Sequence, residues 1–519
     1  MAITACVKRN VQQNSAGCAM VFDSRRRSWS ELQERVARLA GGMKLLGLGA
    51  GDRIAILALN SDRYLEYYIA VPWADGVVVP LNTRWAAAEI VYALNDSNAT
   101  LLLIDDRFLS MADAIKAEVR SLRAIIHMGD GFAPAGMVRY EELIERSDPI
   151  PDAARNGEDL AGIFYTGGTT GFPKGVMLPY RGLWASAMAG LSALGIEDDS
   201  VVLHPAPMFH LADFGLTMAM LLADAAHAIV PVFDPEQVLA AIARYRVTHA
   251  LLVPTMIGMV VMHPNVMESD LSSLRMLTYG GSPIPEAILI ETMRVLPGCR
   301  LAQAYGMTEL SPIATILTPD YHVLHGEKAG KLTSGGRAAQ CCEVEIVNPD
   351  GVEAKRGVAG EIRVRGPNVM LGYWKKPEET AAALRGGWMY TGDAGYMDEE
   401  GFVYIVDRLK NMIVTGGENV YSAEVENAIS KHRAVAQCAV IGVPDEIWGE
   451  AVHAVVILKH GRQISAQDII EHCRTMIAGY KCPRTVDFRT EPMPLSGAGK
   501  VLKRGLREPY WEARVRQVQ

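Results

Sequence analysis

The sequence predicts an α/β protein: a large N-terminal domain with βαβ sheets sandwiched by helices and a β-rich lobe, followed by a small α+β C-terminal domain. Three observations predict this fold class. Helix and strand patterns alternate over residues 30–105 and 228–253, short strands begin near residue 340, and a compact helix–strand mixture follows residue 410. The chain has 519 residues, of which 49% are hydrophobic, so it can bury a large core and is not mainly disordered.

The first helix is predicted from a start signal and an apolar stripe. Ser30 and Gln33 have the spacing of a capping box, and Gly47 and Gly49 end the pattern. The apolar positions recur at spacings of four and three: Leu32, Val36, Leu39, Met43 and Leu46.

Buried strands and helices then alternate. Strands are expected over 54–57, 77–79 and 101–104, with helices over 61–70 and 86–94. The same rhythm continues with a strand at 228–230, a helix at 238–245 and a strand at 249–253. This order is typical of parallel sheets with helices on their faces.

The pattern of predicted secondary structure changes in the last third of the chain. Residues 361–365 alternate strictly between polar and apolar, which predicts a half-buried antiparallel strand in a β-rich lobe at about 340–406. Beyond it we expect a helix at 423–430, strands at 438–443 and 454–458, and a helix at 466–473. We place the domain boundary between residues 409 and 410.

Charge and hydropathy limit the possible functions. Fifty-one basic and 59 acidic residues give −8, which disfavours nucleic acid as a partner. Nine basic and four acidic residues within 479–519 give this tail +5, which fits either a small polyanion or a solvated helix face. The apolar stretch 251–262 is interrupted by Pro254, and the first residues lack an apolar signal region. We therefore expect a cytoplasmic protein without a membrane span.

The eight cysteines are scattered, and only Cys341 and Cys342 are adjacent. Zinc sites need cysteine or histidine pairs two to four residues apart, and no second pair supplies the remaining ligands. Reduced thiols fit this pattern best.

The strongest chemical signal is a glycine–threonine run that ends in a lysine. Glycine backbone N–H groups, threonine hydroxyls and a lysine charge together suit a polyphosphate, although a flexible turn is the alternative. The spacing differs from that of a Walker A loop. The candidate phosphate-binding residues are Thr166, Gly167, Gly168, Thr169, Thr170, Gly171 and Lys174.

This run resembles the phosphate loop of the adenylate-forming (ANL) superfamily, which includes acyl-CoA synthetases, adenylation domains and firefly luciferase. The usual loop has serine where this chain has Gly167. The change removes one hydroxyl donor and keeps the backbone N–H. Further motifs occur in the order of that family across nearly the whole chain.

Two motifs resemble the family's adenine and phosphate site. Tyr305 is expected to stack on adenine, Thr308 to bond the α-phosphate, and Glu309 to bind Mg²⁺; Glu309 alone would suggest a surface acid. The remaining ATP-binding candidates in these motifs are Gly281, Ser282, Pro283, Gln303, Ala304, Gly306 and Met307.

The other nucleotide and hinge motifs lie closer to the C-terminus. By resemblance, Asp393 and Arg408 bind the ribose, and Lys410 is the hinge about which a mobile lid domain, 410–519, turns. Lys500, in a loop flanked by glycine, is the expected catalytic lysine that bridges the acid and the α-phosphate. Taken alone, it would be an exposed lysine.

The resemblance also implies sites for the acid and for coenzyme A. The acyl pocket is expected to include His210, Tyr279, Gly280, Pro312 and Ile313, although His210 also suits a hydrogen-bonded core position. The CoA candidates are Gly416, Gly417, Trp448 and Lys481; for Trp448 and Lys481, ordinary packing is the alternative.

These motifs predict an AMP-forming acyl-CoA synthetase that uses ATP, Mg²⁺ and CoA. The expected acid has an apolar body, because the pocket residues offer no cation for a second carboxylate: a hydroxycinnamic acid (ferulic or coumaric) or a medium- to long-chain fatty acid. Coumarate–CoA ligases often have glycine in the place of Ala304. Alternatives are an enzyme that loads a carrier-protein thiol, a luciferase-like oxygenase, or an ATP-binding protein without activity. The sequence leaves a homodimer open.

Overall fold

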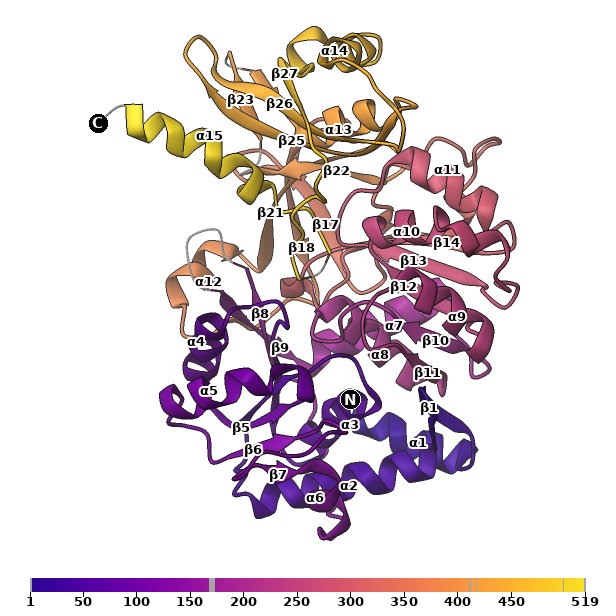
Figure 1. Cartoon of the computed structure of the whole chain (residues 1–519), viewed down its shortest axis with the longest axis vertical. Helices are drawn as coiled ribbons and strands as arrows, with labels where there is room; N and C mark the ends of the chain where they lie inside the picture. Colours follow the sequence, from indigo (N-terminus) through magenta and orange to yellow (C-terminus); the bar gives the residue numbers. More distant parts are fainter. Residues whose placement is uncertain (1, 168–172, 410–411, 417, 498, 518–519) are drawn as a thin grey trace.

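The computed structural model describes residues 2–167, 173–409, 412–416, 418–497 and 499–517. It confirms the predicted α/β fold class, with two large sheets in the N-terminal part, a β-rich lobe, and a smaller α+β unit at the C-terminal end (Figure 1). Within the described residues, no helix has the length and apolar character needed to cross a membrane.

The first sheet has eight strands in the order β19-β9-β8-β4-β3-β5-β6-β7, and β8 through β7 run parallel. Its strands are β3 (Arg53–Leu57), β4 (Val77–Pro80), β5 (Ala99–Ile104), β6 (Ala124–His127), β7 (Val138–Arg139), β8 (Leu160–Thr166), β9 (Lys174–Pro179) and β19 (Gly372–Tyr373). Ile54 and Ile56 face the main core, whereas Ala55 and Leu57 face the other side, as expected for alternation along a strand.

The second sheet has nine strands in the order β16-β15-β14-β13-β12-β10-β11-β1-β2, with parallel pairing from β14 to β1. Its strands are β1 (Cys18–Phe22), β2 (Arg25–Ser28), β10 (Val201–His204), β11 (Ala226–Ile229), β12 (His249–Leu252), β13 (Met276–Gly280), β14 (Arg300–Tyr305), β15 (Thr315–Leu317) and β16 (Arg337–Ala338).

Helices cover both sheets. The main core contains side chains from β3, β10, α3, α7 and α8, so it lies between the two sheets, and a second apolar cluster lies where α9, α10 and α11 cover the second sheet. The helices are α1 (Thr4–Asn14), α2 (Trp29–Leu45), α3 (Asp62–Trp73), α4 (Ala87–Ser97), α5 (Ala112–Glu118), α6 (Tyr140–Glu145), α7 (Tyr180–Leu194), α8 (Leu211–Ala223), α9 (Pro235–Tyr245), α10 (Pro254–Val261) and α11 (Glu286–Val295). Short 3-10 turns are η1 (Asp106–Met111), η2 (Pro264–Met267), η3 (Thr308–Leu310) and η4 (Pro319–Tyr321).

The predicted capping box is wrong by two residues. Helix α2 begins at Trp29, and Ser28 caps it: its Oγ accepts from Glu31 N at 3.3 Å, while Glu31 Oε2 accepts from Ser28 N at 2.7 Å. The sequence offers two overlapping matches to the capping pattern. The earlier match has an ionised carboxylate near the positive end of the helix dipole, which favours it over Gln33.

The β-rich lobe is a five-stranded antiparallel sheet that leads into the C-terminal unit. The alternation predicted at 361–365 is confirmed: Ile362 and Val364 are fully buried in β18. The lobe contains β17 (Glu343–Val347), β18 (Gly360–Arg365), β20 (Leu384–Arg385), β21 (Trp388–Met397) and β22 (Val403–Arg408), with α12 (Pro377–Ala383) alongside.

The C-terminal unit contains β23 (Ile413–Thr415), β24 (Glu418–Val420), α13 (Ser422–Ser430), β25 (Val435–Asp445), β26 (Gly449–Leu458), α14 (Ala466–Arg474), η6 (Gly479–Lys481), β27 (Thr485–Phe488) and α15 (Lys503–Gln517).

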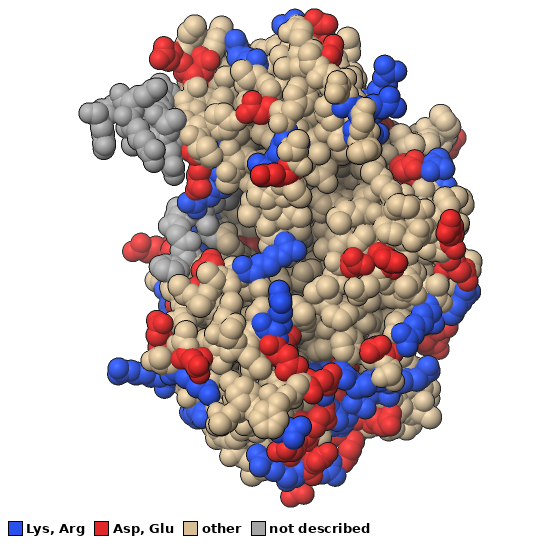
Figure 2. All heavy atoms as spheres, in the orientation of Figure 1, with Lys and Arg blue, Asp and Glu red and all other residues tan. Residues whose placement is uncertain are grey.

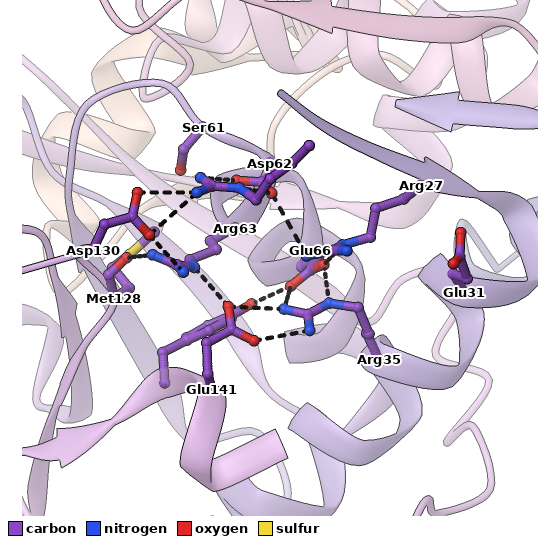
Figure 3. Close-up of polar contacts among 12 residues, drawn as sticks. Arg27, Glu31, Arg35, Ser61, Asp62, Arg63, Glu66, Met128, Asp130 and Glu141 are labelled. Atoms are coloured by element: carbon purple, nitrogen blue, oxygen red, sulfur yellow. Dashed lines mark hydrogen bonds and ion pairs between the residues drawn. The ribbon is translucent and has the colours of Figure 1, made fainter. Parts of the chain in front are cut away.

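A network of ion pairs joins the N-terminal elements (Figure 3). The Glu66 carboxylate on α3 is fully buried; it accepts from Arg35 Nε at 2.6 Å and from the Tyr140 hydroxyl at 2.7 Å. Arg35 also reaches Glu141 on α6, at 2.9 Å. The network therefore fixes α2, α3 and α6 to one another. On the face shown in Figure 2, basic and acidic side chains intermingle around this end of the molecule.

We expect Arg35→Ala to lower the free energy of unfolding of the N-terminal domain by about 3 kcal/mol, because the buried Glu66 charge loses a bidentate partner. Arg139→Ala is the matched control: its ion pair with Glu142 is more than half exposed, so it should cost under about 0.5 kcal/mol. Thermal or urea unfolding measures both variants, and equal shifts would contradict the claim that the network stabilises this domain.

Candidate active site

The predicted phosphate loop joins two antiparallel strands. Thr166 ends β8, Lys174 begins β9, and the two residues are directly paired. Gly167 follows β8 directly, whereas Gly168, Thr169, Thr170 and Gly171 lie outside the described residues.

Tyr373 connects the base of this loop to the central motif. Lys174 Nζ lies 5.2 Å from the centre of the Tyr373 ring, and the Tyr373 hydroxyl donates to Glu309 Oε1 at 2.8 Å. Glu309 is 6% exposed, and burial raises the pKa of its carboxyl. Tyr373 had no sequence signal, because its contacts depend on the pairing of β19 with β9.

The central motif follows β14, beside the end of β13. Gln303 and Ala304 pair with Tyr279 and Gly280, and Thr308 and Glu309 lie in η3. Glycine is required at Gly306, because a Cβ there would lie 2.0 Å from the carbonyl oxygen of Pro312. The Gly281–Ser282–Pro283 turn begins where β13 ends, so two of the predicted motifs meet at one edge of the second sheet.

The predicted ribose residues are in direct contact with the predicted adenine residue. The Tyr305 hydroxyl donates to Asp393 Oδ2 at 2.8 Å, and Arg408 Nε lies 2.6 Å from Asp393 Oδ1. Asp393 is 4% exposed; burial raises the pKa of its carboxyl, and the Arg408 charge opposes the rise. A lobe strand thereby brings a carboxylate to the end of β14.

Lys500 reaches this site from the C-terminal unit. Its loop docks on the N-terminal domain: Thr255 Oγ1 donates to the Gly499 carbonyl at 2.9 Å, and Arg84 donates to the Ser496 carbonyl at 2.6 Å. A Cβ on Gly281, which has φ +84°, would lie 3.1 Å from Lys500 Cε, so this glycine gives the lysine side chain its space.

The pKa of Lys500 is lowered from 10.5 to about 8: burial and then the Arg408 charge lower it, while the Asp393 and Glu309 carboxylates oppose the shift. The ammonium is therefore within electrostatic range of residues from β21, β22 and η3. An amine held in this environment loses its proton at a much lower pH than an exposed lysine.

His210 lies close to the same ammonium. It caps α8, with its Nδ1 accepting from Ala212 N at 3.2 Å. Burial and then the Lys500 charge lower the pKa of His210 to about 3, so the imidazole is neutral at neutral pH. Because Nδ1 is an acceptor, the single ring proton is on Nε2.

The other predicted acyl-pocket residues are more dispersed. Pro312 packs toward Gly215 of α8, and Ile313 lies near Gly190 of α7. The Tyr279 ring is fully buried in the apolar cluster beneath α10 and α11, and its hydroxyl is 3.0 Å from His322 Nε2. Tyr279 thus belongs to the cluster beneath α10 and α11, whereas Phe209 and Leu211, the neighbours of His210, belong to the main core.

Of the predicted CoA residues that the structure describes, Gly416 and Trp448 are in contact, and Lys481 lies in η6. The Gly416 N–H donates to the Trp448 carbonyl at 2.9 Å, and the half-exposed Trp448 ring stacks with Arg484. Lys481 pairs with Glu424 at 2.8 Å. Gly417 and the hinge candidate Lys410 lie outside the described residues.

Comparisons with known proteins show the family of this chain. Residues 7–374 match the family described as "AMP-binding enzyme", and residues 424–500 match "AMP-binding enzyme C-terminal domain". The chain therefore belongs to the AMP-binding enzyme family of adenylate-forming proteins. Within it, the chain is an acid–thiol ligase of the acyl-CoA synthetase type.

Three similar proteins illustrate the relationship. A feruloyl-CoA synthase of an Amycolatopsis species is 39% identical over 485 residues, which cover 93% of this chain and 94% of that protein. The fatty acid–[acyl-carrier-protein] ligase ScoC of Streptomyces coeruleorubidus is 35% identical, with 96% and 95% covered. The structure of ATP-bound MatB from Rhodopseudomonas palustris superposes with a TM-score of 0.88 at 30% identity and covers 98% of this chain and 99% of its own.

Proposed function

We propose that this protein joins a carboxylic acid with an apolar body to CoA, with ATP converted to AMP and pyrophosphate through an acyl-adenylate. The observation that carries the proposal is the placement of Lys500: a lysine of the C-terminal unit lies against Gly281 of the N-terminal domain, within the electrostatic range of Glu309, Asp393 and Arg408. A cytoplasmic location and a homodimer stay predictions.

In the first half-reaction, a carboxylate oxygen of the acid attacks the α-phosphorus of ATP, and the bond to pyrophosphate breaks. The protein supplies position and charge, and it forms no covalent bond. The Lys500 ammonium would bridge the acid and the α-phosphate, Thr308 would donate to that phosphate, and Lys174 would hold the outgoing pyrophosphate. Tyr305, Asp393 and Arg408 would hold the nucleoside.

Glu309 suits the Mg²⁺ that we assign to this reaction. Its carboxylate is a hard oxygen ligand, and burial raises its pKa, so a cation nearby would stabilise the ionised form. Mg²⁺ is commonly held by one or two carboxylates together with substrate phosphates. When bound, the ion would neutralise charge on the triphosphate, and the Tyr373 hydroxyl would orient the Glu309 carboxylate.

In the second half-reaction, the CoA thiolate attacks the acyl carbonyl carbon and AMP leaves. In the present arrangement the Lys500 loop lies against Gly281 and Thr255. A turn of the C-terminal unit about Lys410 would remove this loop and bring Gly416 and Trp448 to the site. The Arg484–Trp448 stack would offer CoA a cation and an aromatic face.

The acid is assigned by class. His210 directly precedes the largely apolar helix α8, which suits the apolar body of an acid. Its Nε2–H is a neutral hydrogen-bond donor. A hydroxycinnamic acid such as ferulic acid and a medium- to long-chain fatty acid both suit this environment, and the names of the relatives include both kinds of acid.

A pyrophosphate-release panel of cinnamic, benzoic and fatty acids tests the proposal, with and without CoA. We expect acid-dependent release that becomes multiple-turnover only when CoA is present. Turnover with a pantetheinylated carrier protein but not with CoA would favour carrier loading instead. No release with any acid would contradict the proposed function.

Lys500→Ala should lower the rate of adenylate formation by a factor of about 10³, because the developing charge at the α-phosphate loses its buried cation. Thioester formation from supplied acyl-adenylate should stay within about twofold, since Lys500 leaves the site for that step. Arg504→Ala, in the same segment, is the control, because its side chain and that of its partner Glu508 are both exposed. Equal losses in the two half-reactions would show that Lys500 has a different role.

The pH profile of adenylate formation follows from the lowered pKa of Lys500. Because the free enzyme loses this proton near pH 8, kcat/KM should fall about tenfold per pH unit above pH 8. A bound triphosphate raises the pKa of the ammonium, so kcat should fall only at a higher pH. Lys500→Arg keeps its charge and should lack the alkaline limb. A wild-type kcat/KM that stays flat to pH 10 would contradict this assignment.

A further inference from the structure

The segment 205–210, which joins β10 to α8 and ends at His210, is held by two side chains from the region of α3. Asn60 Nδ2 donates to the Ala206 carbonyl at 2.8 Å and to the His204 carbonyl at 3.3 Å, while Asn60 Oδ1 accepts from Met208 N at 2.8 Å. The Tyr68 hydroxyl donates to the Met208 carbonyl at 2.5 Å.

These contacts add to a backbone hydrogen bond within the segment, from His210 N to the Pro207 carbonyl at 3.0 Å. Asn60 is 5% exposed and Tyr68 is 1% exposed, so their bonds are shielded from water. A buried carbonyl or N–H without a partner costs about 1–3 kcal/mol, and Asn60 satisfies three such groups at once. The path of this segment therefore depends on a residue that lies more than 140 positions earlier in the chain.

Both ends of the segment are anchored as well. His204 Nδ1 lies 2.9 Å from Asp213 Oδ2, and His204 Nε2 lies 3.0 Å from His227 Nδ1; all three side chains are fully buried. This chain of polar groups joins β10, β11 and the first turn of α8. Because β10 and the first turn of α8 are fixed, a change at Met208 displaces the stretch between them, which includes His210.

We propose that Asn60 and Tyr68 are positioning residues for acid recognition: by fixing Ala206 and Met208, they set where His210 stands and hence how wide an acid the site accepts. The inference rests on the proposed function, in which His210 borders the acid. A shift of about 1 Å in a residue that borders the substrate, such as His210, is enough to change the reaction rate substantially.

Tyr68→Phe and Asn60→Ala test the inference, with Ser61→Ala as the matched control. Ser61 caps α3 by accepting from Tyr64 N at 3.2 Å, so its loss weakens the same helix without touching segment 205–210. Tyr68→Phe keeps the ring that packs 4.2 Å from the Phe214 ring, so it preserves the core. The measurements are KM for the acid, KM for ATP, the kcat/KM ratio for a narrow and a wide acid, and the melting temperature.

We expect Tyr68→Phe and Asn60→Ala to raise KM for the preferred acid about tenfold and to change the narrow-to-wide ratio about fivefold, with KM for ATP within about twofold. Ser61→Ala should lower the melting temperature and leave the ratio unchanged. An unchanged ratio in Tyr68→Phe, or equal effects in Ser61→Ala, would overturn the inference while leaving the proposed function intact. A wild-type protein that releases no pyrophosphate with any acid would overturn the proposed function itself.

Discussion

The arrangement of the candidate site depends on the placement of the Lys500 ammonium against the N-terminal domain. Two hydrogen bonds, from Thr255 and Arg84 to carbonyls of the Lys500 loop, hold it there. Taking an ammonium out of water is costly unless carboxylates or substrate charges compensate, and its lowered pKa reflects that cost. The protein keeps this arrangement because Asp393 and Glu309 lie close enough to offset part of it.

The architecture explains how groups so distant in sequence meet. Strands β13 and β14 run parallel, so their carboxyl ends bring Gly281 and Tyr305 to one edge of the second sheet. The lobe adds Asp393 from β21, and the first sheet adds Lys174 from β9. Tyr305, Asp393 and Lys174 supply polar groups from three elements, and Gly281 leaves the space beside the Lys500 side chain.

Much of the fold could be predicted from the sequence, because hydrophobic periodicity sets the elements, and the resemblance of the motifs to a family predicts the nucleotide site. Contacts made only by tertiary packing had no such signal. Tyr373 meets Glu309 through strand pairing, and Asn60 meets Met208 across the core. The capping box moved to Ser28 because two overlapping patterns competed. The direction of the Tyr279 ring depends on which face of β13 the helices cover, which a motif does not specify.

The central claim is tested most directly by measuring pyrophosphate release and acyl-CoA formation in a variant whose Lys500 loop is locked in place by a disulfide. A Cβ on Gly497 would lie 2.8 Å from Asn82 Cγ, so cysteines introduced by Asn82→Cys and Gly497→Cys are within bonding reach. The oxidised double variant should release one equivalent of pyrophosphate and make almost no acyl-CoA, and reduction should restore turnover; each single variant controls for the native thiols. Acyl-CoA turnover at the wild-type rate in the oxidised protein would contradict the account.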